Sequence, residues 1–306
     1  MRILLTGASG QVGSALRAPL SVFGTVIAAD RTLIDLSRPA DVTDALNNAA
    51  PDLIINPAAF TAVDQAELEP ELAYRVNAQA PREMARWAAS HGVPMIHFST
   101  DCVFDGSGYR PWREDDATGP LSVYGASKLA GEIAVRGAGG SHLVIRTSWV
   151  FASKGRNFLS TIVRSARERN QLRVVSDQVG APTSARLIAE GLTSILHCCR
   201  SGARNDHEQK FRQAGGLVHL TASGETSRHG FACAIVDGLR KRGEKLAVAD
   251  IAAIKTGEYQ ARAARPHNSR LSLARLKTVF DISTSDWRQA LDLELDDLAC
   301  AAPLRS

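Results

Sequence analysis

Residues 2–13, Arg-Ile-Leu-Leu-Thr-Gly-Ala-Ser-Gly-Gln-Val-Gly, decide how the first half of the chain folds. The apolar run 2–5 predicts a buried strand, and glycines follow it at positions 7, 10 and 13. Gly7 permits a tight turn, Gly10 lets the backbone approach a ligand, and Gly13 lets the next helix pack closely. The first N–H groups of that helix would then face an anion, so the segment predicts a phosphate-binding loop. The residues of this loop that we expect to bind a dinucleotide are Gly7, Gly10, Gln11, Val12 and Gly13.

Strands and helices alternate from this loop to about residue 150. Apolar runs predict strands at 25–29, 52–56, 95–98 and 141–147, and amphipathic runs predict helices at 12–20, 71–90 and from 124 onward. This alternation is typical of an α/β protein with a Rossmann-type, doubly wound parallel sheet. We expect residues 1–150 to form an NAD(P)-binding domain.

Residues 151–306 are expected to form mainly a second, smaller α/β domain that binds the substrate. The segment 172–199 is a candidate to return to the first domain. The polar stretch 200–216 contains few apolar residues, and we expect a mobile loop there.

Two neighbouring residues give opposite indications about the cofactor. Asp30 ends the second strand and is suited to bind the adenosine ribose hydroxyls, which favours NAD. Arg31 is suited to pair with a 2′-phosphate, which favours NADP, so the sequence leaves NADPH and NADH open. Asp35 and Leu36 follow in a loop that could pack against the adenine, and a solvated loop acid is an equal alternative for Asp35. The small and apolar residues after the third strand, which we expect along the middle of the cofactor, are Ala58, Ala59 and Phe60.

The reacting groups are expected between residues 97 and 128. Ser99, Thr100 and Asp101 follow a buried strand, at the edge where open α/β sheets bind ligands. Tyr124 and Lys128 stand four residues apart at the start of a helix, so their side chains share one face. A cation beside a phenol favours the phenolate and would lower the pKa of the tyrosine toward the working range. A lone pair of this kind is usually a surface feature, but the phosphate loop and the Ser-Thr-Asp strand end favour a catalytic role.

Two further positions carry open alternatives. Arg265 and Arg270 flank a proline turn that could offer two guanidinium groups to a phosphate, and structural salt bridges are an equal alternative. Asn77 lies on the face of a helix that should meet the sheet. It either holds backbone near the site or is a satisfied amide of the core.

Composition excludes several classes of protein. The chain has 306 residues and a net charge of +4, and its arginines are scattered, which argues against nucleic-acid binding. No apolar run approaches the roughly 18 residues that would span a bilayer. The first strand follows Met1 almost directly, which leaves no room for a signal peptide in this sequence. The five cysteines form no CxxC pair and are expected to be reduced, so we expect a cytoplasmic protein without a metal site.

Seven motifs together resemble the extended short-chain dehydrogenase/reductase family and, within it, the branch that reduces dTDP-4-dehydrorhamnose. They run in order through both halves of the chain: TGASGQVG at 6–13, NPAAFTAVDQAE at 56–67, STDCVFDG at 99–106, YGASKLAGE at 124–132, RTSWVF at 146–151, DQVGAPT at 177–183 and RPHNSRL at 265–271. The resemblance implies that a nicotinamide hydride reduces the C4 ketone of dTDP-4-dehydro-L-rhamnose to give dTDP-L-rhamnose, for rhamnose-containing cell-surface polysaccharides.

The resemblance also implies roles for individual residues. Tyr124 would donate the proton, Lys128 would tune Tyr124 and hold the nicotinamide ribose, and Thr100 would orient the carbonyl. The sugar would meet Thr100, Asp101 and Trp149. The remaining residues that we expect at the ligands are Phe98, at the cofactor, and Arg265, at the substrate.

The sequence departs from the family pattern at several positions. Cys102 stands where tyrosine is common, so substrate packing could differ there. Family members often bind Mg²⁺ at a dimer interface through glutamates. Ala15 and Arg186 occupy two of those positions, and only the acidic cluster around Glu294 remains. We therefore expect no metal, and either a monomer or a homodimer.

Two other functions remain as alternatives. One is a nucleotide-sugar epimerase or dehydratase of the same fold, although a dehydratase would normally carry Asp-Glu after Thr100, where this chain has Asp101 and Cys102. The other is a non-catalytic NADP-binding regulatory subunit, which would have no need of a tuned phenol.

Overall fold

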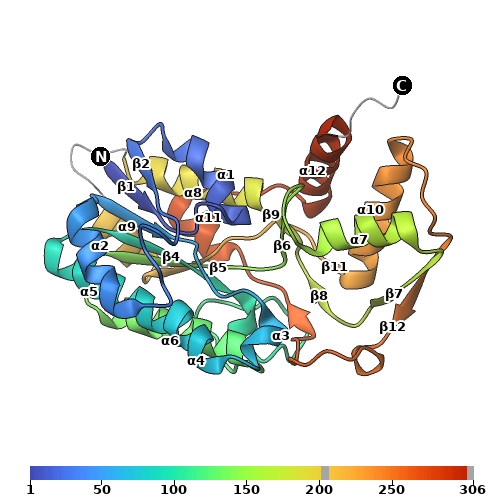
Figure 1. Ribbon diagram of the computed structural model, residues 1–306, viewed down its shortest axis with the longest axis horizontal. Coiled ribbons are helices and arrows are strands. Elements are labelled where there is room, and N and C mark those ends of the chain that lie inside the picture. Colours follow the sequence, from blue (N-terminus) through green and yellow to red (C-terminus); the bar gives the residue numbers. More distant parts are fainter. Residues whose placement is uncertain (201–206, 302–306) are drawn as a thin grey trace.

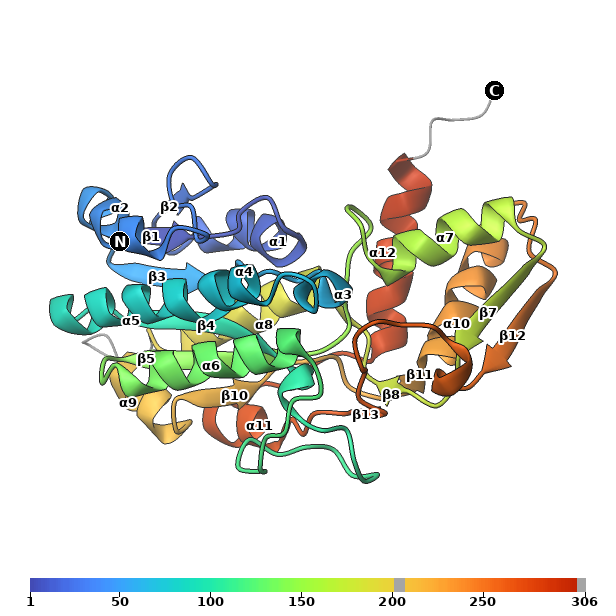
Figure 2. The same cartoon turned by 60° about the horizontal axis from the view of Figure 1, so that its bottom comes forward.

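A parallel sheet forms the centre of the larger lobe. The computed structural model describes residues 1–200 and 207–301. This sheet and its helices form one side of the molecule (Figure 1). The sheet has six strands in the order β10-β5-β4-β3-β1-β2 (Figure 2). They are β1 (Arg2–Leu5), β2 (Thr25–Ala28), β3 (Leu53–Asn56), β4 (Met95–Thr100), β5 (His142–Thr147) and β10 (Leu217–His219). Every pairing in this sheet is parallel, which confirms the predicted doubly wound α/β fold.

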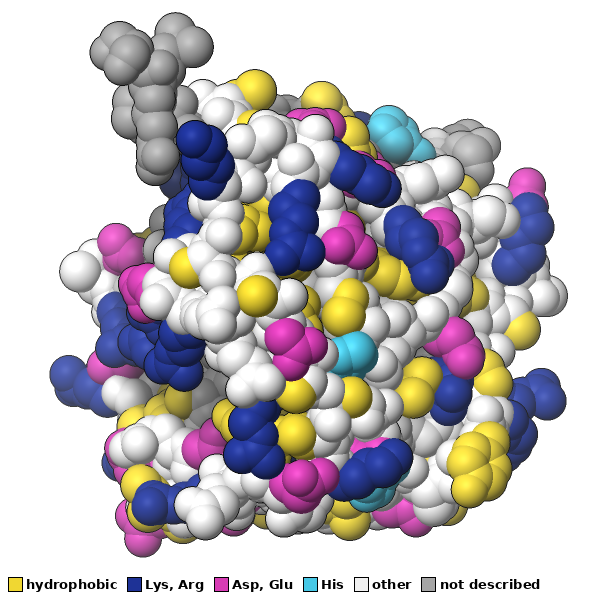
Figure 3. All heavy atoms as spheres, turned by 90° about the vertical axis from the view of Figure 1, so that its right-hand side faces the viewer, with side chains coloured by type: hydrophobic (Ala, Val, Ile, Leu, Met, Phe, Trp, Pro, Cys, Tyr) yellow, Lys and Arg dark blue, Asp and Glu magenta, His cyan; other side chains and the backbone are white. Residues whose placement is uncertain are grey.

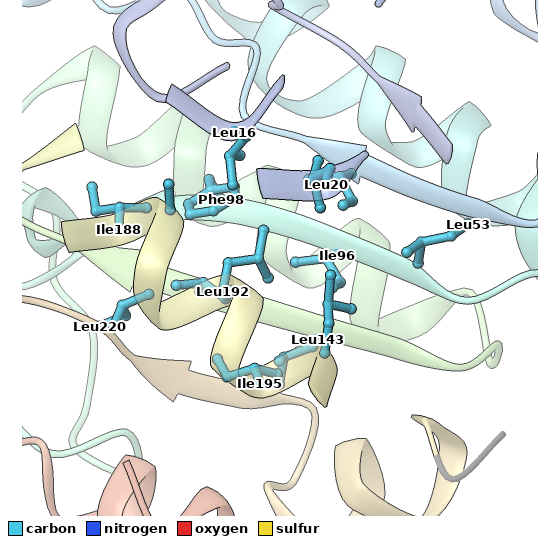
Figure 4. Packing of buried hydrophobic residues seen from close by; sticks show 14 of the residues in the cluster. Leu16, Leu20, Leu53, Ile96, Phe98, Leu143, Ile188, Leu192, Ile195 and Leu220 are labelled. Atoms are coloured by element: carbon cyan, nitrogen blue, oxygen red, sulfur yellow. The ribbon is translucent and has the colours of Figure 1, made fainter. Parts of the chain in front are cut away.

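Helices cover both faces of this sheet (Figure 2). One layer contains α1 (Gln11–Leu20), α8 (Ala185–Cys198) and α11 (Ala274–Phe280), and the other contains α2 (Val42–Ala49), α5 (Ala80–His91) and α6 (Val123–Gly137). Successive side chains of a strand point to opposite faces of its sheet. In β1, Ile3 and Leu5 therefore pack with the first layer and Leu4 packs with the second. Figure 4 shows the first layer, where Leu16 of α1 and Leu192 of α8 lie over the strands.

A second lobe has its own hydrophobic cluster. Helices α7 (Phe158–Glu168), α10 (Arg228–Lys241) and α12 (Trp287–Ala301) pack there with the parallel pair β7 (Gln171–Val175) and β12 (Asp250–Ile254). The short strands between the lobes are β6 (Val150–Phe151) paired with β9 (Thr183–Ser184), and β8 (Val179–Gly180) paired with β11 (Thr226–Ser227) and β13 (Asn268–Ser269).

Segments from the second half of the chain also pack in the larger lobe. Helix α8 and strand β10 come after residue 150 and pack in the larger lobe, against α1 and β5. Where one domain ends and the next begins stays a prediction.

Two expectations about helices need correction. The helix expected over 71–90 is composite, with α4 (Pro70–Tyr74), a π-helical turn η2 (Arg75–Gln79) and then α5. The loop expected over 200–216 contains helix α9 (His207–Gln213), whose Phe211 is buried in the core. Residues 201–206 of that stretch lie outside the described residues.

Candidate active site

The loop between β1 and α1 is a close-packed glycine turn. Gly7 has a φ of +56°, and a Cβ at this position would lie 2.9 Å from the Cα of Ala58. A Cβ on Gly13 would lie 2.1 Å from the carbonyl oxygen of Gly7, so α1 begins directly against the turn. The N–H of Gly10 donates to the same carbonyl over 2.9 Å. The first N–H groups of α1 thus border a backbone-lined surface of the kind that a pyrophosphate requires.

The second lobe holds one residue of this loop. The side-chain oxygen of Gln11 accepts a hydrogen bond from Nδ2 of Asn157 over 2.9 Å, and Asn157 is the N-cap of α7. Val12 packs at the edge of the cluster under α1. Gln11 therefore ties the glycine loop to the lobe that we expect to bind the substrate.

Asp30 is engaged by its own turn. Its Oδ1 accepts hydrogen bonds from the backbone N–H and the hydroxyl of Thr32, over 2.9 and 2.6 Å. These bonds, the hydroxyl first, hold the pKa of Asp30 below its ordinary value. Arg31 beside it is exposed. Asp30, which would favour NAD, is thus hydrogen-bonded within its own turn. Arg31, which would favour NADP, lies at the surface.

Asp35 and Leu36 are also held within the larger lobe. Asp35 accepts hydrogen bonds from the backbone and hydroxyl of Ser37, over 2.9 and 2.7 Å, and these lower its pKa. Leu36 is buried in the cluster that α2 shares with the sheet. Their proposed contact with an adenine stays a prediction.

Asn77 holds backbone beside the site. Its Oδ1 accepts from the N–H of Phe60 over 2.8 Å, and its Nδ2 donates to the carbonyl of Phe60 over 3.2 Å and to the hydroxyl of Ser127 over 2.9 Å. Ser127 in turn donates to the carbonyl of Tyr124 over 2.8 Å. One buried amide therefore connects the loop after β3 with the first turn of α6, which favours the first of the two roles predicted for Asn77.

Lys128 is a buried lysine at the end of a hydrogen-bonded chain. Its Nζ donates to the carbonyl of Phe98 over 2.6 Å and lies 3.5 Å from Nε2 of His97. Nδ1 of His97 lies 3.0 Å from the amide of Asn56, which accepts from the hydroxyl of Thr6 over 2.5 Å. Burial lowers the pKa of Lys128 to about 8 and holds the pKa of His97 well below its usual range. A neutral His97 leaves the ammonium as the cation of this pair.

A buried ion pair lies one turn further along α6. Glu132 accepts two hydrogen bonds from the guanidinium of Arg146 on β5, over 2.9 and 2.7 Å, and a third from the hydroxyl of Ser99. The two charged side chains are only 1% and 3% exposed. The charge of Glu132 raises the pKa of Lys128 and so opposes part of the effect of burial. The sequence alone predicts no role for either residue of this pair.

The environment of Tyr124 differs from the expected one. Burial raises the pKa of its phenol, the nearby Cys102 and Asp101 add to the increase, and a hydrogen bond with Thr100 and the charge of Arg265 oppose it. The expectation that a cation would lower this pKa is therefore wrong for this structure, because loss of solvent outweighs the favourable charge of Arg265. The phenol is protonated at neutral pH, which is the form that can donate a proton.

Asp101 and Cys102 form the wall next to the phenol. Asp101 is buried and accepts a hydrogen bond from the hydroxyl of Thr100 over 3.0 Å. Burial raises its pKa, against hydrogen bonds from Ser269 and Thr100. The pKa of the Cys102 thiol rises to about 12, mainly through burial, so the thiol stays neutral.

The turn 265–271 brings the second lobe against this wall. The guanidinium of Arg265 binds Asp64 over 2.8 Å, and the N–H of Ala263 donates to the same carboxylate over 3.0 Å. A Cβ on Gly106 would lie 2.6 Å from the Cα of Pro266, so only glycine allows the loop after β4 to meet the turn this closely. The charge of Arg265 also lowers the pKa of Tyr124, so this guanidinium lies near the phenol while it is paired with Asp64. Its contact with a substrate stays a prediction.

Arg270, in the same turn, does not serve the site in this structure. Its guanidinium binds both carboxylate oxygens of Glu225 over 2.7 and 3.2 Å and the side-chain oxygen of Asn268 over 3.1 Å. Arg270 therefore forms a structural salt bridge, which is the alternative to a phosphate contact.

An arginine absent from the sequence predictions also lies at the site. The guanidinium of Arg228, at the start of α10, lies 3.7 Å from the centre of the Trp149 ring. Trp149 itself has a φ of +47°, a left-handed conformation that few non-glycine residues adopt. Burial lowers the pKa of Arg228, the charges of Asp101 and Cys102 raise it, and the charge of Arg265 lowers it further. No local motif marks Arg228, because it follows Gly-Glu-Thr-Ser far from the other site residues in sequence.

Ala15 and Arg186, which stand where the family pattern has metal-binding glutamates, make contacts of other kinds. Ala15 packs at the edge of the cluster under α1. Arg186 lies 2.5 Å from Asp297 and 3.6 Å from the buried Glu294, whose other oxygen accepts from the N–H of Ser153 over 2.6 Å. The guanidinium of Arg186 therefore pairs with two of the acidic side chains of α12.

The surface carries charges of both signs. Figure 3 shows basic and acidic side chains interspersed over the end of the second lobe, without a broad basic face. Within residues 1–200 and 207–301, every helix is too short or too polar to cross a bilayer.

Comparison with known proteins places the chain in a family. A family model described as the RmlD substrate binding domain matches residues 1–300. The chain belongs to this family. A dTDP-4-dehydrorhamnose reductase of Burkholderia thailandensis is 44% identical over 300 residues, which cover 97% of this chain and 99% of the relative. The enzyme of the same name from Escherichia coli K12 is 42% identical over 302 residues, with 97% and 98% covered.

Solved structures of the same family agree with this fold. A dTDP-4-dehydrorhamnose reductase of Clostridium acetobutylicum is 33% identical and superposes with a TM-score of 0.86, over 97% of this chain and 99% of that one. The reductase of Bacillus anthracis, solved in complex with NADP, is 30% identical with a TM-score of 0.85 and the same coverage. In this chain a Cβ on Gly7 or Gly13 would clash with neighbouring backbone, so both positions keep the close-packed turn that a dinucleotide pyrophosphate requires.

Proposed function

We propose that the chain catalyses the NADPH-dependent reduction of the C4 ketone of dTDP-4-dehydro-L-rhamnose to dTDP-L-rhamnose. The observation that carries this proposal is the protonated phenol of Tyr124, which is hydrogen-bonded with Thr100 at the carboxyl end of β4. The identity of more than 40% over nearly the whole chain to reductases of that name supports the substrate. The cytoplasmic location of the protein stays a prediction, and so does its oligomeric state, a monomer or a homodimer.

The residues of this chain provide a site for the cofactor. The glycine turn and the first N–H groups of α1 would hold its pyrophosphate, Arg31 would meet a 2′-phosphate, and Ala58, Ala59 and Phe60 would border its middle. When bound, NADPH supplies the hydride for the ketone.

Tyr124 then acts as the general acid. As charge develops on the C4 oxygen, the phenol donates its proton to that oxygen, and the hydroxyl of Thr100 helps to orient the carbonyl. The ammonium of Lys128 stabilises the phenolate that remains, and Asn77 and Ser127 hold the first turn of α6 so that the phenol keeps its place. Asp101, Trp149 and Arg265 would contact the sugar nucleotide.

The decisive experiment follows the loss of NADPH absorbance with freshly prepared dTDP-4-dehydro-L-rhamnose. Tyr124→Phe should lower kcat by about 10²- to 10⁴-fold, the usual contribution of a positioned general acid, and leave NADPH binding unchanged. Tyr109→Phe is the matched control, because Tyr109 is 93% exposed on a loop. NADPH binding without oxidation by the wild type would reject the proposal and favour a binding subunit. NAD that remains bound through purification would favour an epimerase or dehydratase.

A further inference from the structure

The guanidinium of Arg228 differs from the other arginines at the site. Arg265 is paired with Asp64 and Arg270 with Glu225. Within the described residues, the guanidinium of Arg228 makes neither an ion pair nor a hydrogen bond, and its contacts are the faces of Trp149, at 3.7 Å, and Phe158, at 5.3 Å. A guanidinium has five N–H donors, and stacking on a ring satisfies none of them.

The position of Arg228 relative to the phenol indicates what these donors could meet. Asp101, Cys102 and Arg265 act electrostatically on both Tyr124 and Arg228. The three side chains therefore lie close to both groups. The strand pairing agrees, because β8 pairs with β11, which ends one residue before Arg228, and with β13, whose Ser269 hydrogen-bonds Asp101.

Holding a bare cation at this place has a cost. Loss of solvent lowers the pKa of Arg228 to about 10, although the charge of Asp101 opposes this. A partly buried cation that makes no hydrogen bond within the described residues has lost hydration, and contact with an aromatic ring supplies none of the missing acceptors. An anionic ligand would supply the missing acceptors, and a planar guanidinium matches phosphate oxygens in a two-pronged geometry.

We infer that Arg228 binds the diphosphate of the sugar nucleotide and so fixes the distance between that diphosphate and the proton donor, Tyr124. This inference rests on the proposed function for the choice of nucleotide. It makes Arg228 a substrate-positioning residue, with Trp149 as the rigid surface that holds its guanidinium flat.

The test measures binding of dTDP by calorimetry to the wild type, Arg228→Gln and Arg228→Lys. Hydrogen bonds between charged groups contribute about 1.5–3 kcal/mol, so Arg228→Gln should raise the Kd for dTDP by about 10- to 100-fold. Arg228→Lys keeps the charge but loses the planar fork, and should fall between the two. Binding of uncharged thymidine and of NADPH should not change. Arg288→Gln is the matched control, since Arg288 also stacks on a tryptophan, Trp287, at 4.3 Å, but outside the site.

Kinetics separate this role from a purely structural one. With the keto-sugar as substrate, Arg228→Gln should raise KM far more than it lowers kcat, and the pH profile of kcat should keep its shape. Wild-type affinity for dTDP in Arg228→Gln would overturn the inference, as would an equal loss of affinity for thymidine, or a loss of NADPH binding alone. A wild type that does not bind dTDP would reject the inference as well.

The same measurements distinguish the inference from the proposed function. Arg228-dependent binding of dTDP without reduction of the keto-sugar would reject the function and leave a nucleoside-diphosphate site. Rapid reduction with unchanged dTDP affinity in Arg228→Gln would keep the function and reject the inference.

Discussion

Replacing Arg146 by methionine would break the buried ion pair beneath the active site. Glu132 would lose hydrogen bonds of 2.9 and 2.7 Å and keep only the one from Ser99. Because both charged side chains are at most 3% exposed, solvent cannot replace the lost guanidinium. Breaking one partner out of such a pair typically costs about 3–5 kcal/mol, so we expect a decrease of that size in the free energy of unfolding.

The double variant Arg146→Met/Glu132→Leu separates the loss of the pair from the loss of packing. A buried pair exchanged for apolar side chains of similar volume is often neutral or stabilising, so the double variant should recover most of the lost stability. Chemical unfolding of the wild type, both single variants and the double variant, followed by fluorescence, gives the coupling energy. A loss below about 1 kcal/mol in Arg146→Met, or a double variant less stable than both singles, would refute the reasoning.

Three further predictions address the helix, the cofactor and the lysine. Gly131→Ala should disturb the contact between α6 and η2, because its Cβ would lie 2.1 Å from the carbonyl oxygen of Asn77, whereas Gly137→Ala on the same helix meets no atom within 4 Å and should change stability by at most about 1 kcal/mol. Thermal unfolding compares the two variants. Arg31→Ala should raise the Kd for NADPH by up to about fivefold, the contribution of an exposed ion pair, and leave that for NADH unchanged, which a fluorescence titration with each cofactor measures. Lys128→Met should flatten the increase in stability from pH 7 to 10, measured by chemical unfolding at both pH values.

The alternation of the fold could be predicted because each of its elements is marked locally. The strand and glycine turn of residues 2–13 and the apolar strand 53–56 carry their own signals. The π-helical turn η2 does not, because it depends on a contact between distant segments. Gly131 of α6 has no side chain where the carbonyl of Asn77 approaches, and no periodicity within 71–90 records that contact. The short α9 could not be predicted for a similar reason. Its sequence is mostly polar, and the helix packs on the core through the buried Phe211.

The site divides along the same line. Thr100, Tyr124 and Lys128 could be predicted from a strand end and a four-residue spacing, which are local features. The partner of Glu132 could not, because Arg146 belongs to a strand 14 residues away and looks like any other arginine in the sequence. The pKa of Tyr124 was predicted in the wrong direction, because the sequence shows the neighbouring charges and not the loss of solvent.

The buried Lys128 shows why the site and the stability of the chain oppose each other. Its pKa is about 8 in the folded chain, against 10.5 for the free side chain, so the folded state disfavours the ammonium. Below pH 8 the full cost applies, which corresponds to about 3 kcal/mol for a shift of this size. Between pH 8 and 10.5 the unfolded chain binds more protons, so this contribution to the free energy of unfolding rises with pH.

Lys128→Met removes the titration but also leaves the carbonyl of Phe98 without its donor, which costs about 1–3 kcal/mol. The variant should therefore be about as stable as the wild type at pH 7 and less stable by about 2–3 kcal/mol at pH 10. Titration of the other groups affects both proteins alike and cancels in the difference. Parallel stability curves over this range would mean that Lys128 keeps an ordinary pKa. The ammonium could then not stabilise the phenolate of Tyr124 more strongly than a solvated lysine would.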